Sequence, residues 1–473
     1  MNTRSTKALI IGGGPGGYVC AIRLAQLGIK PLLIEKENIG GTCLNSGCSP
    51  SKAIISAAKL AGKIREAGSW GIRVGEVAID FPALLDWKNE VVRKLINGIG
   101  VLLKGNAVEV IAGHATFRSA HTVEVTTQTG QIEITAENIV IATGSVPAEL
   151  PNFSPDGKRV LDSTQALNME ALPRQLVVLG GGYIGLELGS AYAKLGSNVV
   201  IVEMLDQVLP GLDPEIARLL ERRFKRSGGA LYLGSRATGW SEGPEGIQVE
   251  IAAAGTTKTL PCDKIIVSVG RRPASSGLNL AAAGLALDPQ GFLPVDKQMR
   301  TAMAGIFAIG DLAGNPMLAH KASREGEVAA EVIAGLPASW DNRCIPAVVF
   351  SDPEVATVGL MEHEARGQGR NIKVGKFPFA ALGRALTAQE TEGFVKVVLA
   401  SDTEEILGVA IVGPNASDLV AEAALAIEMG ALYPDLALTV HAHPTLPEAL
   451  REALLAAKGG AIHALKLPAT ANR

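Results

Sequence analysis

The sequence is poor in cysteine and in aromatic residues, and it has no long apolar run. Only five of its 473 residues are cysteine, and 4% are aromatic. A sparse, odd set of cysteines in a long chain excludes the disulfide framework of a small secreted protein. No apolar run reaches the ~18 residues of a transmembrane helix, and the run at residues 8–11 is too short for the core of a signal peptide. We therefore expect a cytoplasmic protein without a membrane partner.

Neither sign of charge is in clear excess, since 44 basic and 47 acidic residues leave a net charge of −3. This balance excludes a strongly basic nucleic-acid-binding protein. Glycine, in contrast, is abundant at 54 residues, and 47% of the chain is hydrophobic against 19% charged. Such a composition is typical of a globular protein with many tight turns. At ~150 residues per domain, the length predicts about three domains.

The first glycine cluster lies between a predicted strand and a predicted helix. Residues 8–11 form a short apolar run, Gly12, Gly14 and Gly17 follow, and Glu35 ends the next apolar run. In such a βαβ unit, glycine permits the tight turn, the approach of a pyrophosphate and the contact of helix with strand, while the acid binds a ribose hydroxyl. A turn with a purely structural role is the alternative, but the context favours a dinucleotide site.

The same pattern returns in the middle of the chain. An apolar run at 175–179 precedes Gly180, Gly182 and Gly185, and Glu203 ends the following run. A carboxylate at this position accepts from a free 2′-hydroxyl and repels a 2′-phosphate, which favours NAD over NADP. Arg271 and Arg272 follow a later glycine, Gly270, and are either phosphate contacts or ordinary surface charges. Two such sites predict a tightly bound FAD and a transient NAD(H).

Two cysteines begin a predicted helix. Cys43 and Cys48 stand five positions apart, whereas Cys20, Cys262 and Cys344 are isolated in apolar or turn contexts. A helix N-terminus lowers the pKa of a thiol, so the pair is suited to form a reversible disulfide beside a flavin. A structural pair is one alternative. A zinc site is another, but no second Cys or His pair lies nearby in the sequence, and we expect no bound metal.

The last cluster combines two histidines with an acid. His441 and His443 precede Glu448 in the motif HAHPTLPE. A histidine held by a carboxylate is a general acid and base, and Glu448 is placed to orient His443. The alternatives are a surface histidine and a His-x-His metal ligand, which would need a third ligand from elsewhere.

The predicted fold class is α/β, with two Rossmann-like dinucleotide-binding domains and a C-terminal α+β dimerisation domain. We expect an FAD-binding domain with the redox disulfide at 1–148, an NAD-binding domain at 149–272, a central segment returning to the FAD at 273–345, and the interface domain at 346–473.

Together these motifs resemble the pyridine nucleotide-disulfide oxidoreductases, and within them the dihydrolipoamide dehydrogenases. The similarity covers nearly the whole chain. It rests on GGGPGGY (12–18), GGTCLNSGCSPSK (40–52), ATG (142–144), GGGYIGLELG (180–189), VGRRP (269–273), AIGD (308–311), MLAH (317–320) and HAHPTLPE (441–448).

The resemblance implies a role for each matching residue. Cys43 would be the interchange thiol and Cys48 the charge-transfer thiol, while His443 and Glu448 would form the acid–base dyad. Lys52 would lie near the flavin N5 and pair with Glu187, where nicotinamide docks. Asp311 would bind the ribityl chain. The cofactor-binding set would also include Gly41, Thr42, His114 and Ala115 (near the adenine), Thr143, Gly144, Ser145, Gly270, Gly310, Met317, Leu318, Ala319 and His320.

The resemblance further implies that the enzyme reoxidises dihydrolipoamide to lipoamide with NAD⁺, as dihydrolipoyl dehydrogenase. It would be a homodimer whose dyad reaches the partner's disulfide. Lipoyl domains of 2-oxo acid dehydrogenase complexes, or of the glycine cleavage system, would be its partners. Ser46 and Ser49 depart from the aliphatic residues usual beside Cys48, and are either neutral or shift the redox potential of the couple.

Four alternative functions are disfavoured. A glutathione-type reductase would use NADPH, against which Glu203 argues, and a mercuric reductase needs C-terminal cysteines that this chain lacks after Cys344. A diaphorase or NADH oxidase, or a non-catalytic structural subunit, would leave Cys43, Cys48 and His443 unexplained.

Overall fold

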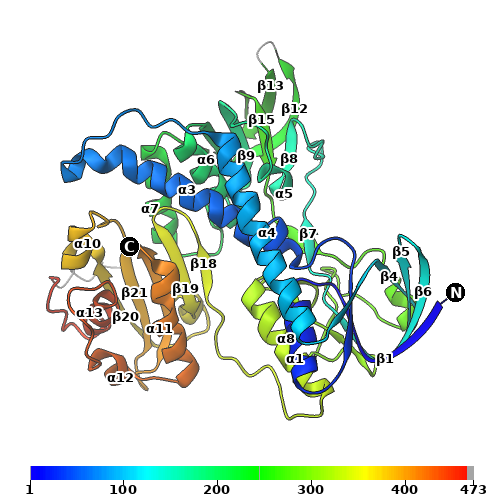
Figure 1. Ribbon diagram of the computed structural model, residues 1–473. Helices are drawn as coiled ribbons and strands as arrows, with labels where there is room; N and C mark the ends of the chain where they lie inside the picture. The colour runs from blue at the N-terminus through cyan, green and yellow to red at the C-terminus, as the bar shows by residue number, and fades with distance from the viewer. Residues whose placement is uncertain (1, 244–245, 466–473) are drawn as a thin grey trace. The chain divides into compact units, whose positions relative to one another are not determined.

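The computed structural model describes residues 2–243 and 246–465. The chain folds into two compact units. Unit 1 comprises Met1–Leu172 and Ile266–Asp341, and unit 2 comprises Pro173–Ile265 and Asn342–Arg473. Both units mix helices with sheets, so the predicted α/β class is confirmed, whereas the finer four-part division stays a prediction (Figure 1). Within the described residues, no helix is both long and apolar enough to cross a membrane.

Unit 1 is built on a seven-stranded sheet of order β3-β2-β1-β6-β5-β4, with β17 also pairing with β6. Its parallel part contains β1 (Asn2–Ile11), β2 (Pro31–Glu35), β3 (Glu109–Ala112), β6 (Gly130–Ile141) and β17 (Ile306–Ala308). The antiparallel part adds β4 (His114–Ser119) and β5 (Thr122–Thr127). Successive side chains of a strand face opposite sides, so Ala8 and Ile10 enter one core while Leu9 and Ile11 enter the other.

Helices α1 (Pro15–Gln26) and α8 (Ala319–Ile333) lie side by side in unit 1 (Figure 1). Glycine permits this close approach. A Cβ atom on Gly16 would lie 3.0 Å from the Ala322 carbonyl oxygen, and one on Gly326 would lie 2.5 Å from the Gly16 carbonyl oxygen. Gly16 faces Ala322, and Gly326 faces both Gly16 and Cys20. Contacts further along α1 are made with residues further along α8. The two helices therefore run parallel, and their N-termini point the same way.

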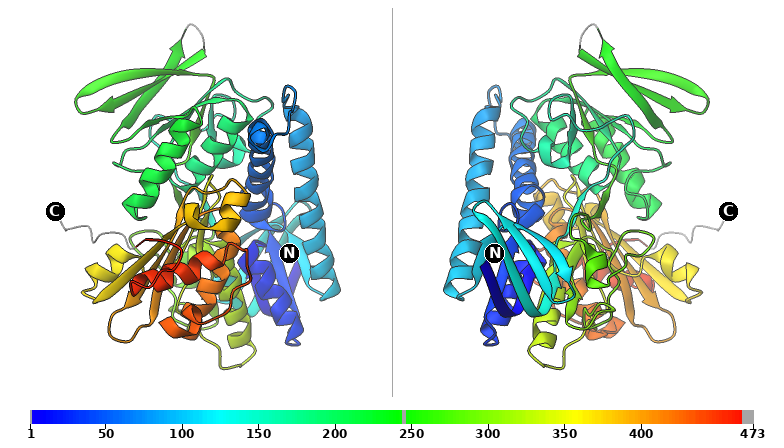
Figure 2. Two further views of the ribbon diagram at one scale, coloured as in Figure 1. Left: turned by 90° about the vertical axis from the view of Figure 1, so that its left-hand side faces the viewer. Right: turned by 90° about the vertical axis from the view of Figure 1, so that its right-hand side faces the viewer.

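The remaining elements of unit 1 are peripheral to this sheet. The long helices α3 (Cys48–Glu66) and α4 (Phe81–Gly105) lie alongside each other (Figure 2). Strand β7 (Ser145–Pro147) pairs antiparallel with β16 (Arg271–Pro273), and these two strands frame the segment that leads to unit 2 and back. Shorter elements are α2 (Gly41–Asn45), β8 (Val160–Asp162) and α5 (Ser163–Ala166).

Unit 2 contains a second parallel sheet and two antiparallel ones. Strands β9 (Gln175–Leu179), β10 (Asn198–Val202) and β11 (Ala230–Tyr232) run parallel, with α6 (Tyr183–Leu195) between the first two and α7 (Pro214–Arg226) between the last two. Strands β12 (Arg236–Gly243), β13 (Gly246–Ala253) and β14 (Thr256–Cys262) form an antiparallel ribbon, and β15 (Lys264–Val267) leads back toward unit 1.

The C-terminal part of unit 2 is an antiparallel sheet of order β18-β19-β22-β21-β20. Helices α11 and α13 pack on it and α12 packs on α13, around a core of mostly Val, Leu, Ile, Ala and Phe side chains. The bounds are β18 (Ala347–Val349), β19 (Glu354–Gly359), α9 (Glu362–Gly367), β20 (Ile372–Pro378), α10 (Gly383–Thr387), β21 (Phe394–Ala400), β22 (Ile406–Gly413), α11 (Ala416–Met429), α12 (Tyr433–Ala437) and α13 (Glu448–Ala457).

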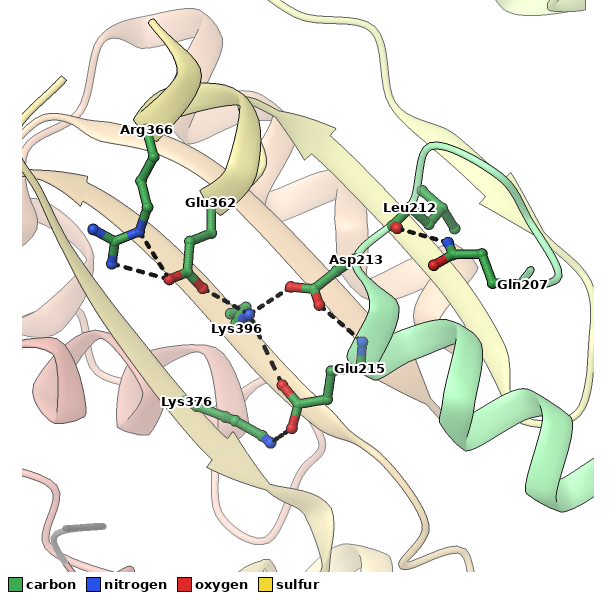
Figure 3. A network of polar contacts seen from close by, with 8 residues as sticks. All are labelled: Gln207, Leu212, Asp213, Glu215, Glu362, Arg366, Lys376 and Lys396. Carbon is green, nitrogen blue, oxygen red and sulfur yellow. Dashed lines mark hydrogen bonds and ion pairs between the residues drawn. The ribbon is translucent and has the colours of Figure 1, made fainter. Parts of the chain in front are cut away.

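A charged network joins α7 to the C-terminal sheet within unit 2 (Figure 3). The buried Lys396 ammonium lies 2.5 Å from Asp213, the N-cap of α7, and 2.9 Å from Glu362. Glu215 pairs with Lys376, and Glu362 also accepts from Arg366. Burial alone would lower the pKa of Lys396, but its carboxylate partners outweigh burial and raise that pKa.

Candidate active site

Two glycines of the first turn, Gly12 and Gly17, stand where any side chain would collide with backbone. Gly12 has a left-handed φ of +106°, and a Cβ there would lie 2.4 Å from the Ala142 carbonyl oxygen. A Cβ on Gly17 would lie 1.8 Å from the Gly12 carbonyl oxygen, since helix α1 touches strand β1 at that point. Around Gly14, in contrast, the nearest atom to a Cβ is the Gly41 Cα at 3.8 Å. The N-terminus of α1 is thus open for an anion.

In both glycine turns, the carboxylate at the end of the next strand accepts hydrogen bonds from two backbone amides. Glu35 accepts hydrogen bonds from the Gly13 amide at 2.6 Å and from the Glu37 amide at 2.8 Å. Glu203 accepts from the Gly181 amide at 2.6 Å and from the Leu205 amide at 2.8 Å. Both carboxylates are buried. The sequence predicted two equivalent turns, but not that each acid would bind an amide of its own turn.

A cavity of about 560 Å³ opens beside the first acid. Residues from the segment after β2, from α4 and from β3 line it, among them Glu35, Asn38, Ile39, Asn97, Lys104 and Ala112. His114 and Ala115 follow directly in β4 but are not among the lining residues. Their contact with an adenine ring therefore stays a prediction.

The two cysteines lie at successive helix starts, Cys43 in α2 and Cys48 at the first position of α3. Both are thiols, and their side chains are hydrogen-bonded to each other. The hydrogen bond with Cys48, then burial and the charge of Cys48, raise the pKa of Cys43, against the opposing effect of the Lys52 ammonium. The expectation that the helix N-terminus lowers this pKa is wrong for Cys43, because two adjacent thiols share one site and resist losing a second proton.

Asp311 is the middle residue of η3 (Gly310–Leu312), which follows strand β17 and precedes helix α8. Its Oδ2 accepts from the Ser145 hydroxyl at 2.5 Å, and that hydroxyl accepts from the Arg271 Nε at 2.8 Å. The Gly310 amide donates to Glu325 at 2.6 Å, while Lys321 donates to the Gly310 carbonyl at 3.2 Å. Met317 and Leu318 then lead into Ala319 and His320 at the start of α8.

His443 and Glu448 form a hydrogen-bonded pair at the N-terminus of α13. The His443 Nδ1 lies 2.8 Å from Glu448 Oε1, and the Thr445 amide donates to Oε2 at 2.8 Å. Burial opposes ionisation of Glu448, but the Thr445 amide and His443 outweigh it and lower the pKa of Glu448. The His443 side chain is 77% exposed. Because Nδ1 is held, Nε2 is the ring nitrogen available to a substrate.

Two further imidazole–carboxylate pairs lie near this dyad, and His441, His463 and Glu452 line a cavity of about 240 Å³ together with it. His441 Nε2 lies 2.8 Å from Glu422, and His463 Nδ1 lies 3.0 Å from Glu452. Sequence reasoning missed both pairs, although Glu448 and Glu452 stand one helical turn apart on α13 and thus share a face. Among the described residues, no group of His, Cys, Asp and Glu side chains is arranged to hold a metal ion.

The remaining expected residues are spread over the two units. Glu187, on α6, is buried and accepts from the Phe350 amide at 2.9 Å. Lys52 is on α3 in unit 1, so its pairing with Glu187 stays a prediction. Thr143 donates to the Ala274 carbonyl at 2.8 Å, and Gly144 and Gly270 have left-handed φ values of +72° and +119°. Gly182 is the N-cap of α6, and Gly185 lies in its first turn.

Comparison with known proteins places these features in one family. Residues 6–326 match the model for pyridine nucleotide-disulphide oxidoreductases, and residues 345–454 match the dimerisation domain of the same family. The chain is 48% identical over 458 residues to a dihydrolipoyl dehydrogenase of Geobacillus stearothermophilus, covering 97% of both chains. It is 46% identical to one of Bacillus subtilis, covering 98% of both.

Solved structures are similar over almost the whole chain. LpdA from Mycobacterium tuberculosis matches with a TM-score of 0.88 at 30% identity, over 95% of this chain and 99% of that one. The HOCl-induced flavoprotein disulfide reductase RclA from Escherichia coli matches with a TM-score of 0.84, also at 30% identity, over 95% and 99%.

Proposed function

Because the chain belongs to the pyridine nucleotide-disulphide oxidoreductase family, we propose that it reoxidises dihydrolipoamide to lipoamide with NAD⁺. One observation supports this most directly: a hydrogen-bonded thiol pair, Cys43 and Cys48, occurs in the same chain as a His443–Glu448 dyad. Relatives covering 97–98% of the chain are named dihydrolipoyl dehydrogenase. A glutathione reductase or an NADH oxidase is not favoured by any of these observations.

The residues of both glycine turns fit the cofactors of the family, FAD and NAD(H). For FAD, the open N-terminus of α1 suits the pyrophosphate, and Glu35 with the 560 Å³ cavity suits the adenosine part. Asp311 Oδ1 accepts no hydrogen bond within the described part of the chain, which leaves it for a ribityl hydroxyl. The turn of Gly180, Gly182 and Gly185 with Glu203 suits NAD(H). When bound, the flavin accepts an electron pair from a thiolate and NAD⁺ accepts a hydride.

The thiols and the dyad carry out the exchange. His443 takes a proton from one thiol of dihydrolipoamide, and the resulting thiolate attacks Cys43 of the oxidised pair. The Cys43–Cys48 bond breaks, and a mixed disulfide forms while Cys48 leaves as a thiolate. The second substrate thiol then displaces Cys43, so that lipoamide closes and both enzyme thiols are reduced. Glu448 orients His443 through Nδ1 and stabilises its imidazolium form.

The C-terminal part corresponds to the family's dimerisation domain, and a homodimer follows in our proposal. The dyad of one subunit would act on the thiol pair of the other. Exposed apolar side chains on unit 2 support an interface there: Leu425, Met429, Leu438 and Val440 are 64–95% exposed. Lipoyl domains of 2-oxo acid dehydrogenase complexes, or of the glycine cleavage system, are the proposed partners, and the cytoplasm is the proposed location.

The test measures NAD⁺ and NADP⁺ reduction by dihydrolipoamide. The wild type should prefer NAD⁺, and Cys43→Ser should abolish the reaction while keeping FAD bound. Cys20→Ser is the matched control, since Cys20 is fully buried in the core of unit 1. Full lipoamide activity in Cys43→Ser would refute the mechanism. Faster turnover with glutathione disulfide and NADPH, or with O₂ and NADH alone, would assign one of the alternative functions.

A further inference from the structure

The carboxylate of Asp311 is held by a relay of two side chains from distant parts of the sequence. The Ser145 hydroxyl donates to Asp311 Oδ2 at 2.5 Å and accepts from Arg271 Nε at 2.8 Å. A second Arg271 nitrogen, Nη2, donates to the Ser145 carbonyl at 2.8 Å. Ser145 is buried, with 6% exposure. The serine hydroxyl is therefore fixed between a cation and an anion.

The backbone on both sides of the relay is fixed as well. Strands β7 and β16 pair so that Ser145 stands opposite Pro273 and Arg271 opposite Pro147. On the Asp311 side, the buried Glu325 and Lys321 form an ion pair at 2.9 Å. They bind the amide and the carbonyl of Gly310. Asp311 thus has little freedom in either its backbone or its Oδ2.

We infer that Arg271 is a positioning residue for cofactor binding: through Ser145 it holds Asp311 with Oδ2 occupied and Oδ1 free to accept from a hydroxyl of the ribityl chain of FAD. This inference deepens the proposed function and rests on it. Hydrogen bonds to charged groups are the stronger ones, and the Ser145 hydroxyl makes two of them, one from the Arg271 guanidinium and one to the Asp311 carboxylate. Arg271, Ser145 and Asp311 all belong to unit 1. In this inference Arg271 is therefore neither the phosphate contact nor the ordinary surface charge that the sequence left open.

The neighbouring arginine provides a matched control. Arg272 follows Arg271 in β16, but its guanidinium makes an exposed ion pair with Glu149 at 3.2 Å. The side chains of Arg272 and Glu149 are 49% and 78% exposed. Exposed ion pairs of this kind contribute little to the stability of a protein. Substitution of Arg272 therefore removes the same charge from the same strand without touching the relay.

The experiment titrates FAD into FAD-free protein and measures its dissociation constant, with no lipoamide present. Arg271→Gln and Ser145→Ala should each weaken FAD binding by about ten- to a hundredfold, as expected for losing a hydrogen bond to a charged group. Arg272→Gln should stay within about twofold. Arg271→Lys retains the charge but loses the bidentate hydrogen bonding of the guanidinium, so its FAD affinity should lie between those of Arg271→Gln and the wild type.

The double variant Arg271→Gln/Ser145→Ala identifies the path. If Arg271 acts only through Ser145, the FAD dissociation constant of the double variant should not exceed that of the single variant that binds FAD more weakly. Equal affinities of Arg271→Gln, Arg272→Gln and the wild type would overturn the inference, as would fully additive losses. The thermal midpoint of the FAD-free variants should match that of the wild type. If the thermal midpoint of FAD-free Arg271→Gln falls and Arg271→Lys does not restore it, Arg271 has a merely structural role.

Failure of the proposed function gives a different result. If the wild type binds FAD but does not oxidise dihydrolipoamide, the substrate proposal fails and the relay can still be measured. If the wild type binds no FAD, both proposals are overturned.

Discussion

The contact between α1 and α8 predicts that one small substitution, Gly326→Ala, destabilises unit 1 and weakens FAD binding. The new Cβ would lie 2.5 Å from the Gly16 carbonyl oxygen and 3.2 Å from the Cys20 nitrogen. Outside its own residue and the neighbouring ones, a real Cβ atom essentially never has a heavy atom within 3.0 Å. Both contacts are with helical backbone, which cannot rotate away, so the two helices must separate by about half an ångström.

The magnitude follows from two opposing effects. Alanine is a better helix former than glycine by about 0.5–1 kcal/mol. Overpacking of a well-packed contact costs typically about 1–3 kcal/mol. The net expectation for Gly326→Ala is therefore a loss of about 1–2 kcal/mol. For a unit of this size, 1 kcal/mol corresponds to a change in thermal midpoint of about 2–4 °C.

Gly98→Ala supplies the control. Gly98 is also within a helix, α4, but apart from its own helix backbone no atom of the described residues lies within 4 Å of its Cβ position. Only the helix-propensity gain remains, so the thermal midpoint should rise by about 1–4 °C. The assay is the thermal midpoint of FAD-free and FAD-bound protein for both variants. If Gly326→Ala raised the midpoint as Gly98→Ala does, the close packing of α1 on α8 would be refuted.

Three further predictions concern the charges of unit 2. Lys396→Met removes the buried ammonium that the half-buried carboxylates of Asp213 and Glu362 share (Figure 3) and should cost about 1.5–3 kcal/mol in thermal unfolding. Lys458→Met, which breaks a more exposed pair with Glu404, should cost less than about 1 kcal/mol; equal losses would contradict the burial argument. The pKa of Glu452 is lowered because, although burial opposes this, its hydrogen bonds to His463 and Ile462 prevail. At a pH above 4.5, the usual pKa of a glutamate, ionised Glu452 therefore stabilises the fold, and this contribution is lost as the pH falls below that value. Between about pH 5 and pH 3, the thermal midpoint of Glu452→Gln should fall less than that of the wild type. Glu448→Ala removes the partner of His443 Nδ1 and should lower kcat with dihydrolipoamide by about 10²–10⁴-fold at nearly unchanged FAD affinity; a retained kcat would show that Glu448 does not orient the imidazole.

Local features were predictable from the sequence because their geometry depends on neighbouring residues. Strand, glycine spacing and acid together define each dinucleotide turn. Gly12 and Gly180 have nearly equal φ values, +106° and +103°. The five-residue separation of His443 and Glu448 allowed their contact to be anticipated. In these cases the interacting residues belong to one βαβ unit or stand a few positions apart, so pattern and structure coincide.

Features that depend on distant segments were not predictable. Gly326 carries no motif, and its packing on Gly16 exists only because α1 and α8 pair. Arg271 was ambiguous in the sequence because its partner Ser145 stands 126 positions away. The direction of the Cys43 pKa also depends on a neighbour, Cys48, and on burial, rather than on the helix start alone. A single sequence contains no measure of such proximities.

The pairing of β7 with β16 has a consequence for how such a chain can be cut and joined. The Ala148 amide donates to the Gly270 carbonyl at 3.0 Å, so the residues between these two positions form a closed excursion whose ends meet. Insertions with adjacent ends can be exchanged without disturbing their host. A different nucleotide module, grafted between Ala148 and Gly270, would therefore meet two chain ends that are already held together by this ladder. It would also have to replace Asp213 and Glu215, which pair with Lys396 and Lys376 of the C-terminal sheet.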